Sequence, residues 1–83
     1  MEKSIYTREY NAVTRVLKRV REEAEMTQVD LAEALGQSQS FVSKVERGER
    51  RLDIIQLRTL CETLGLTLAE FVDQLEKEIR SRR

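Results

Sequence analysis

Hydrophobic residues recur at intervals of three and four along most of this 83-residue chain, with charged residues between them. The clearest stripe, which falls on one side of a helix at 100° per residue, consists of Val13, Val16, Leu17 and Val20. This spacing is typical of amphipathic helices that pack on a core, so we predict an all-α fold without a sheet. The first helix is expected to begin near Thr7, a candidate N-cap. The predicted helices span residues of about 7–24, 27–36, 38–47, 53–64 and 67–80.

Capping signals set the bounds of the later helices. Thr27 and Asp30 form a close relative of the capping box, in which each side chain accepts a hydrogen bond from the other residue's backbone N–H, and Ser38 suits the N-cap of the third helix. Gly36 and Gly48 follow the second and third helices in the manner of C-terminal glycines. Two further boxes open the last two helices, on either side of Gly65: Asp53 with Gln56, and Thr67 with Glu70.

Length and composition suit one small helical domain over residues 1–83. A chain this short buries only about 60% of its unfolded surface, so its stability margin is narrow and oligomerisation would widen it. The chain has no proline, only three glycines, two tyrosines and two phenylalanines. No apolar run approaches the roughly 20 residues of a membrane span, and we therefore expect a cytoplasmic protein that does not enter membranes.

The sequence offers no set of residues for catalysis or metal binding. It has no histidine and one cysteine, which removes the usual zinc sites, the Ser-His and Cys-His nucleophile pairs and any internal disulfide. We therefore expect no catalytic residue, no metal, no cofactor and no small-molecule ligand. The cysteine is expected to be an inert buried thiol on one stripe of the fourth helix, which consists of Ile54, Leu57, Cys61 and Leu64.

The predicted third helix has a polar face of an unusual kind. On a helical wheel Phe41, Val42 and Val45 fall within one wedge of about 100°, which suits the core. The opposite side carries short hydrogen-bonding side chains and basic residues: Gln39, Ser40, Ser43, Lys44 and Arg47. Because this side lacks the alternating Glu and Lys of an ordinary solvated face, we expect it to contact something polar and negative.

Gln, Ser, Lys and Arg are the residue types that contact base edges in the major groove of DNA, and an α-helix fits that groove. Two helices joined by a tight glycine turn supply the matching docking geometry, here over residues 27–47. Seven residues match the helix-turn-helix of the phage-repressor and Cro family position for position: Gln28, Leu31, Ala32, Leu35, Gly36, Val42 and Val45. Family-like spacing extends from about Leu17 to Leu75, so most of the chain resembles this family of small XRE-type transcriptional regulators.

The resemblance implies a compact five-helix, lambda-repressor-like DNA-binding domain, as used in bacterial and phage regulators. It implies that Gln28 contacts a phosphate, a role that suits the N-terminus of a helix. It also implies that four residues of the third helix face the bases: Gln39, Ser40, Ser43 and Lys44. Three arginines at the exit of this helix and in the next loop are assigned mainly to phosphates: Arg47, Arg50 and Arg51.

Two further positions concern how the third helix is held. Arg21 and Glu46 match the family positions at which an arginine of the first helix pairs with a glutamate of the recognition helix, so the resemblance implies a structural ion pair. Phe41 has two interpretations, packing at the edge of the core or contact with a thymine methyl group, and we favour packing.

The charge balance limits the expected affinity for DNA. Fifteen basic and fifteen acidic residues give zero net charge, whereas DNA-binding domains are usually basic. Residues 37–51 contain four basic residues and two acidic ones, while the acids cluster at residues 22–33 and 70–78. With few phosphate contacts per subunit, tight binding is expected to need two subunits on one site.

The fifth predicted helix carries surface for such a dimer. Four apolar residues recur at i, i+4, i+7 and i+11, namely Leu68, Val72, Leu75 and Ile79. With Leu66 and Phe71 available to the core, the helix has more apolar surface than a bundle of this size covers. We therefore predict a symmetric homodimer that binds a palindrome with half-sites about 34 Å apart.

Two functions are considered for the chain. The first is a transcriptional regulator that binds double-stranded DNA, for which restriction-modification controller proteins, phage Cro-like repressors and antitoxins are all relatives of this size. The second is a helical protein-interaction module of the same fold that does not bind DNA, for example one with an antitoxin-type partner. A continuous positive strip joining Gln28, the polar face of the third helix and Arg50 would favour DNA. The role of the extension at residues 1–8, with Lys3 and Arg8 as its basic residues, is left open.

Overall fold

A computed structural model describes residues 3–81 and shows five helices, with no strand in that range. The helices are α1 (Lys3–Glu23), α2 (Gln28–Leu35), α3 (Gln39–Glu46), α4 (Ile54–Thr63) and α5 (Leu68–Ser81). The all-α prediction is confirmed, and α2 to α5 begin and end within one residue of their predicted bounds. No helix in the described range is long and apolar enough to cross a membrane.

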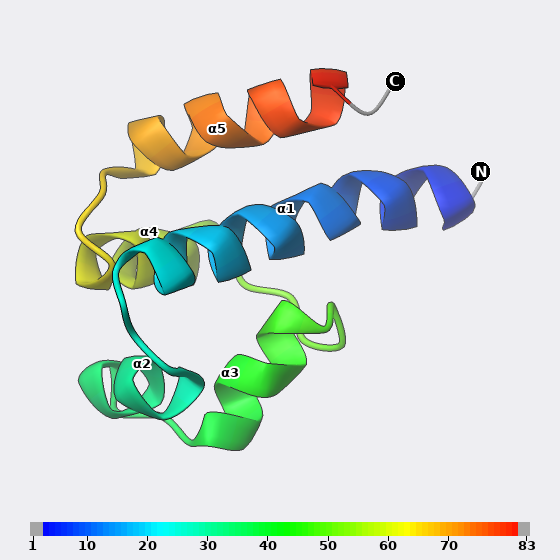
Figure 1. The fold of residues 1–83 in the computed structure, drawn as a ribbon. Coiled ribbons are helices and arrows are strands. Elements are labelled where there is room, and N and C mark those ends of the chain that lie inside the picture. Colours follow the sequence, from blue (N-terminus) through cyan, green and yellow to red (C-terminus); the bar gives the residue numbers. More distant parts are fainter. Residues whose placement is uncertain (1–2, 82–83) are drawn as a thin grey trace.

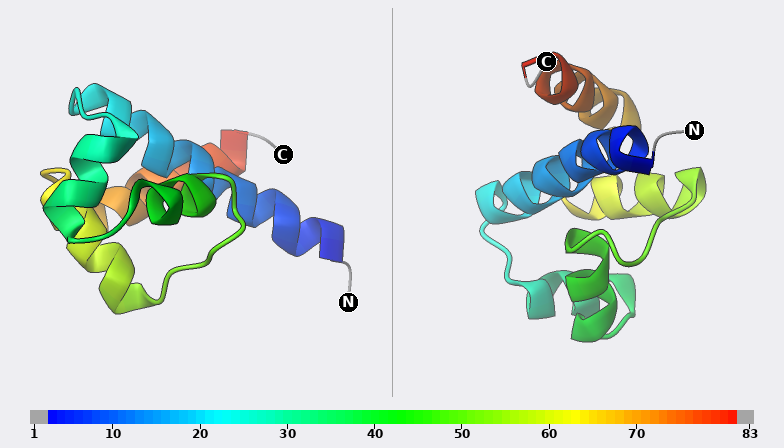
Figure 2. Two further views of the ribbon diagram at one scale, coloured as in Figure 1. Left: turned by 90° about the horizontal axis from the view of Figure 1, so that it is seen from below. Right: turned by 90° about the vertical axis from the view of Figure 1, so that its right-hand side faces the viewer.

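Helix α1 is the central element of the domain. In Figure 1 it runs across the middle of the molecule, with α5 above it and α2 and α3 below it, and the right-hand view of Figure 2 shows the same order. Helix α1 packs against α3 and α5, while α2 packs against α3 and α4, and α4 also packs against α5. The α2–α3 pair and α5 therefore lie on opposite sides of the domain.

All five helices contribute to one hydrophobic core. Its most deeply buried large side chains come from every helix in turn, and they are Val16, Leu31, Val42, Val45, Cys61 and Phe71. The stripe predicted on α1 is largely buried, with Val13 partly buried at its edge. Because the core spans all elements of a small domain, the position of α3 depends on α1 and α2 together.

The predicted caps hold the α2–turn–α3 unit in shape. The backbone N–H of Thr27 donates to Asp30 Oδ2 at 2.9 Å, and the N–H of Asp30 donates to Thr27 Oγ1 at 3.0 Å. The hydrogen bond from the Thr27 backbone lowers the pKa of Asp30. Ser38 Oγ accepts from the N–H of Phe41 at 3.1 Å. Gly36 lies between the two helices at φ 67°, a conformation that costs glycine little and other residues more.

The structure differs from two sequence expectations about helix positions. Helix α1 begins at Lys3 rather than near Thr7, so residues 3–8 are its first turns and not an extension that precedes it. The segment contains no glycine or proline, and threonine is tolerated inside a helix, so nothing stops α1 at Thr7. The side chains of residues 1–7 lie outside the described part, and so does the role considered for Lys3.

The second difference concerns Ile54, which the sequence places on the same helical stripe as the buried thiol of Cys61. The side chain of Ile54 is 59% exposed. Helix α4 reaches the core only from its second turn onward, where Leu57 is partly buried and Leu60, Cys61 and Leu64 are buried. Burial raises the pKa of the Cys61 thiol to about 11, in line with an inert thiol.

Candidate DNA-binding interface

The polar face predicted on α3 is present on the surface of the molecule. Val42 and Val45 are buried against the core, and they direct the opposite side of the helix outward. On that side Gln39, Ser40 and Lys44 are exposed and Ser43 is half-buried. The structure thus brings the four expected base-contacting residues together on one short helix.

A buried ion pair connects this helix to α1. Arg21 Nε donates to Glu46 Oε2 at 2.6 Å and Arg21 Nη2 donates to Glu46 Oε1 at 3.1 Å, while Arg21 Nη1 donates to the carbonyl of Met26 at 2.8 Å. The two side chains are only 9% and 6% exposed. The hydrogen bond to Glu46 raises the pKa of Arg21 against the opposing effect of burial. The arginine therefore stays charged and joins α1, the α1–α2 connection and α3.

Gln28 takes part in the same network, which sequence reasoning missed. Its Nε2 donates to Glu46 Oε1 at 3.0 Å, so the side chain of the first residue of α2 faces the ion pair. The sequence gave only an indirect indication of this contact: Gln28 opens the helix that is next in the chain to Arg21, whose pairing with Glu46 was predicted. The phosphate contact assigned to Gln28 stays a prediction, and its backbone N–H at the start of α2 is as suited to it as the side chain.

The arginines that follow α3 have intramolecular partners as well. Arg47 Nε donates to Glu49 Oε2 at 2.8 Å and Arg47 Nη2 donates to Glu49 Oε1 at 3.3 Å, while Arg47 Nη1 donates to Ser43 Oγ. These hydrogen bonds raise the pKa of Arg47 and lower the pKa of Glu49. Both side chains of this pair are more than half exposed. An exposed pair of this kind opens at little cost, so Arg47 can exchange Glu49 for a phosphate.

Two aromatic rings support the loop between α3 and α4. The guanidinium of Arg50 lies 5.1 Å from the centre of the Phe41 ring, and that of Arg51 lies 4.5 Å from the centre of the Tyr10 ring. Phe41 is half-buried and packs against the core, which agrees with the favoured interpretation of this residue. Gly48, at the start of this loop, lies close to the side chains of Thr14 and Tyr10. A Cβ placed on it would be at ordinary contact distance from them, 3.8 and 3.9 Å.

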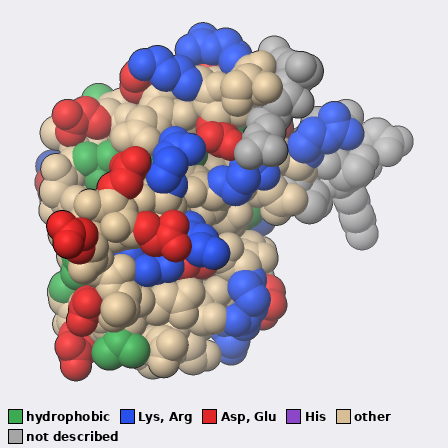
Figure 3. Space-filling view, in the orientation of Figure 1, with side chains coloured by type: hydrophobic (Ala, Val, Ile, Leu, Met, Phe, Trp, Pro, Cys, Tyr) green, Lys and Arg blue, Asp and Glu red, His purple; other side chains and the backbone are tan. Residues whose placement is uncertain are grey.

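The surface charge is divided between the two helices of the motif. In Figure 3 basic side chains gather at the lower right, on the α3 side, and acidic side chains gather at the lower left, on the α2 side. The exposed basic residues of this region are Lys44, Arg47, Arg50 and Arg51, with Glu49 as their acidic neighbour. The α3 side and the following loop are therefore the positive part of the surface. The described residues include no cluster of three or more His, Cys, Asp or Glu that would hold a metal ion.

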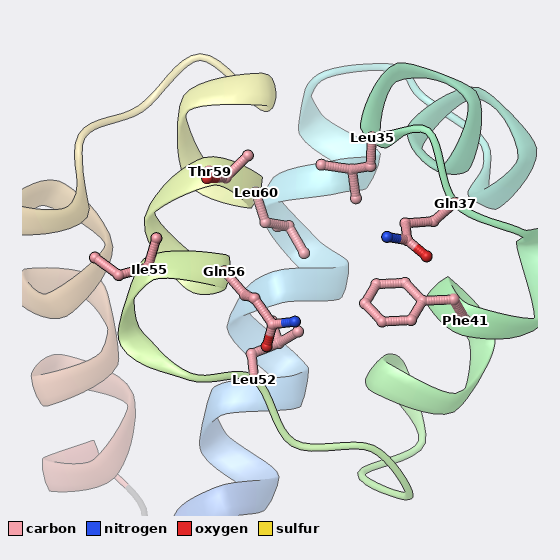
Figure 4. A pocket seen from close by; sticks show the side chains of 8 residues that line it. All are labelled: Leu35, Gln37, Phe41, Leu52, Ile55, Gln56, Thr59 and Leu60. Atoms are coloured by element: carbon pink, nitrogen blue, oxygen red, sulfur yellow. The ribbon is translucent and has the colours of Figure 1, made fainter.

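A shallow groove lies beside α3, on the side of that helix that carries Phe41. It has a volume of about 150 Å³ and runs between the α2–α3 turn and α4. Figure 4 shows Leu35, Gln37 and Phe41 on one side of it. The other side is formed by α4 and the loop before it, with Leu52, Gln56, Thr59 and Leu60.

The apolar residues predicted for a dimer contact are mostly occupied within the domain. Leu68 and Leu75 are half-buried and pack against the core, and Ile79 is half-buried. Val72 is 42% exposed. Two arginines of α1 hold α5 in place, since Arg15 and Arg19 donate to Glu78 at 2.8 and 3.0 Å. The surplus apolar surface of α5 is therefore smaller than the sequence suggested.

Comparison with known proteins identifies the family. The family model for the helix-turn-helix matches residues 17–71, which run from the middle of α1 into α5. The chain belongs to the helix-turn-helix family. A solved structure of an XRE-family-like protein from Pseudomonas syringae pv. tomato str. DC3000 is 40% identical and covers 90% of this chain and 92% of its own, with a TM-score of 0.82. The XRE-type resemblance found in the sequence is thereby confirmed.

Controller proteins are among the other proteins similar to this chain. The control protein C.MunI from Mycoplasma sp is 30% identical over 75% of this chain and 85% of its own length. The restriction-modification controller protein C.Esp1396I, solved as a tetramer in complex with its natural 35-base-pair operator, is 34% identical with a TM-score of 0.78. That match covers 86% of this chain and 93% of the controller protein.

Proposed function

We propose that this protein is a sequence-specific transcriptional regulator that binds double-stranded DNA. Helix α3 enters the major groove, where Gln39, Ser40, Ser43 and Lys44 contact base edges. Gln28 and the arginines at positions 47, 50 and 51 contact phosphates, which set the position of α3 in the groove without determining the sequence. The similarity to controller proteins, one of them solved with its operator, supports this class of function.

One observation carries the proposal. The exposed polar face of α3 is held on the domain by a buried ion pair between Arg21 and Glu46, with Gln28 as a third member. A helix that contributed only to a solvated surface would not need a buried charge to fix it, because burying a charge is costly even when it is paired. A fixed helix with an adaptable polar face is what recognition of base edges requires.

We further propose that the functional unit on DNA is a homodimer on a palindromic operator. The net charge of zero and the few exposed basic residues of each subunit limit the affinity of a single copy. Two copies related by a two-fold axis double the phosphate contacts and recognise two half-sites about 34 Å apart. The surface of α5 around Leu68, Val72, Leu75 and Ile79 stays the contact predicted from the sequence.

Selection of bound sites from random duplex DNA, followed by sequencing, tests both statements. A palindromic consensus is expected. With that site, Lys44→Ala and Gln39→Ala should each weaken preference at particular base pairs by about 1 to 3 kcal/mol. Arg50→Ala should weaken binding to all sequences equally and lower the salt slope by about one contact. Equal losses on cognate and random duplex for all three variants would mean that α3 is not the recognition helix, and absence of any bound site would favour the protein-interaction module.

A further inference from the structure

Two neighbouring arginines in the loop between α3 and α4 differ from the other arginines of the domain in what they contact. The guanidinium of Arg50 lies 5.1 Å from the centre of the Phe41 ring, and that of Arg51 lies 4.5 Å from the centre of the Tyr10 ring. The other arginines at positions 15 to 58 each pair with a glutamate, and they are Arg15, Arg19, Arg21, Arg47 and Arg58.

A guanidinium that stacks on an aromatic ring keeps its hydrogen-bond donors available. The ring attracts the cation through its π face, while the five N–H groups of arginine lie in the plane of the guanidinium and point away from its edge. Within the described residues, neither the Arg50 nor the Arg51 guanidinium forms an ion pair or donates a hydrogen bond. Both side chains are exposed. The two cations are therefore held in place without being neutralised, which leaves them available to a phosphate.

The ring of Tyr10 contacts this loop at two points. It lies under the guanidinium of Arg51, and its Cδ2 would be 3.9 Å from a Cβ placed on Gly48, three residues earlier. In Figure 1 the loop lies below α1, toward the N-terminal half of that helix. A half-buried side chain of α1 therefore helps to place a loop that belongs to the candidate DNA-binding interface.

The backbone does not fix Arg51 by itself. The N–H groups of residues 49 and 50 both donate to the carbonyl of Lys44, at 2.9 and 3.2 Å, and they hold the first part of the loop on α3. In the described part of the chain, no hydrogen bond holds the backbone of residues 51–52. The side chain of Leu52 packs against the core, whereas that of Arg51 is exposed and contacts Tyr10. The stack therefore sets the direction of the Arg51 side chain.

We propose that Tyr10 is a positioning residue for DNA binding, which holds the Arg51 guanidinium where it contacts a phosphate. This rests on the proposed function, in which Arg51 is a phosphate contact. An arginine that rotates freely loses conformational freedom when it binds, whereas a stacked arginine has already lost much of it. The family model matches residues 17–71, so Tyr10 adds a determinant of DNA affinity that lies outside the matched region.

The expected effect is small and independent of base sequence. An exposed cation–π contact corresponds to about a two- to fivefold change in affinity. Because phosphates are alike in every duplex, loss of Tyr10 should lower the affinity for cognate and random duplex by the same factor. A displacement of α3 would instead reduce the preference for the cognate site, because base contacts would be lost. The ratio of the two affinities therefore separates positioning of Arg51 from damage to the domain.

A double-mutant cycle on DNA affinity tests the proposal. Tyr10→Ala and Arg51→Ala are measured singly and together by fluorescence anisotropy, on the duplex found by site selection and on a random duplex. Tyr10→Ala should weaken binding by about two- to fivefold in the parent and have no further effect in the Arg51→Ala background. Arg51→Ala should also lower the salt slope by about 0.9. An unchanged salt slope in Arg51→Ala, or an equal effect of Tyr10→Ala in both backgrounds, overturns the proposal.

Conservative variants separate the aromatic face of Tyr10 from its bulk. Tyr10→Phe keeps the ring and should bind DNA like the parent, whereas Tyr10→Leu keeps apolar bulk without a π face and should bind like Tyr10→Ala. Arg51→Lys keeps the charge but not the planar group, so it should lose the benefit of Tyr10. Asn11→Ala changes the next, exposed position of α1 and is the matched control, with no expected effect on affinity. Parental affinity in Tyr10→Leu would overturn the proposal.

The stack itself is measured without DNA. In the NMR spectrum, the ring current of Tyr10 should shift the side-chain Hδ protons of Arg51 upfield in the parent and in Tyr10→Phe, but not in Tyr10→Leu. A parent that shows this shift and binds no duplex would refute the proposed function, and the positioning role with it. A parent that binds DNA but lacks the shift would refute the positioning role alone and leave the proposed function intact.

Discussion

Helix α3 is bordered by two ion pairs of the same chemistry and opposite surroundings. In both, an arginine Nε donates to a glutamate Oε2, at 2.6 Å for Arg21 and Glu46 and at 2.8 Å for Arg47 and Glu49. The first pair is almost fully buried, whereas each side chain of the second is more than half exposed. Distance alone would rank the two pairs as equal, so burial decides what each pair does.

The buried pair acts on the fold, and the exposed pair leaves its arginine accessible to a ligand. Removal of Glu46 would leave Arg21 charged and without its main partner in the interior, which is costly. Removal of Glu49 would leave Arg47 in water, where a free guanidinium costs almost nothing. One pair therefore fixes α3 on the domain, and the other leaves a cation beside α3 that is available to phosphate.

The largest expected effect tests the buried pair. Arg21→Ala and Glu46→Ala should each lower the free energy of unfolding by about 3 to 5 kcal/mol, and the double variant should lose less than the sum, since each single change leaves one charge without its partner. Denaturant unfolding of the four proteins in this cycle gives the coupling. Gln28→Ala serves as a comparison, because it removes one hydrogen bond to Glu46 but no charge, and it should cost about 1 kcal/mol. Strict additivity would show that the pair does not fix α3.

The structural features that depend on periodicity and residue spacing could be predicted from the sequence. The bounds of α2 to α5, the capping boxes at Thr27 and Asp53, and the pairing of Arg21 with Glu46 all follow from local pattern or from matched family positions. The partners of Gln28 and Arg47 did not follow, because a flexible polar side chain has several acceptors in reach and tertiary packing selects one. The exposure of Ile54 did not follow for a related reason, since periodicity gives the direction of a side chain but not the point at which a helix enters the core.

A smaller effect is expected for Cys61, a buried ionisable group that has no opposite charge beside it, in contrast to Arg21 and Glu46. The test is how the free energy of unfolding depends on pH. Burial raises the pKa of Cys61 from 9.0 to about 11, and nearby Glu62 adds to the shift. The unfolded chain therefore loses this proton at lower pH than the folded chain. The stability due to the protonated thiol is present below pH 9 and is lost as pH rises toward 11.

The free energy of unfolding should fall over that interval by at most about 1.4 kcal/mol per pH unit from this group. Because tyrosine and lysine titrate in the same range, the measurement is the difference in pH slope between the parent and Cys61→Ala. Native Cys61 should also react slowly with an alkylating reagent at neutral pH. Equal slopes for the two proteins would show that the thiolate is not disfavoured in the fold.

The smallest expected effect tests the exposed pair, and it has the opposite sign. Glu49→Gln removes the acidic partner of Arg47, and because both side chains are largely in water the thermal midpoint should hardly change. The freed guanidinium should then strengthen binding to all duplexes by a few-fold and increase the salt slope by about 0.9, the value of one added phosphate contact. Asp73→Asn is the matched control, since it opens the exposed pair with Lys77 on α5 and changes the net charge equally at a site far from α3. An affinity gain as large in Asp73→Asn as in Glu49→Gln would mean that net charge alone, and not release of Arg47, causes the gain. A loss of affinity in Glu49→Gln would mean that Glu49 positions Arg47 for DNA. The exposed pair would then be part of the DNA-binding surface, as the buried pair is part of the core.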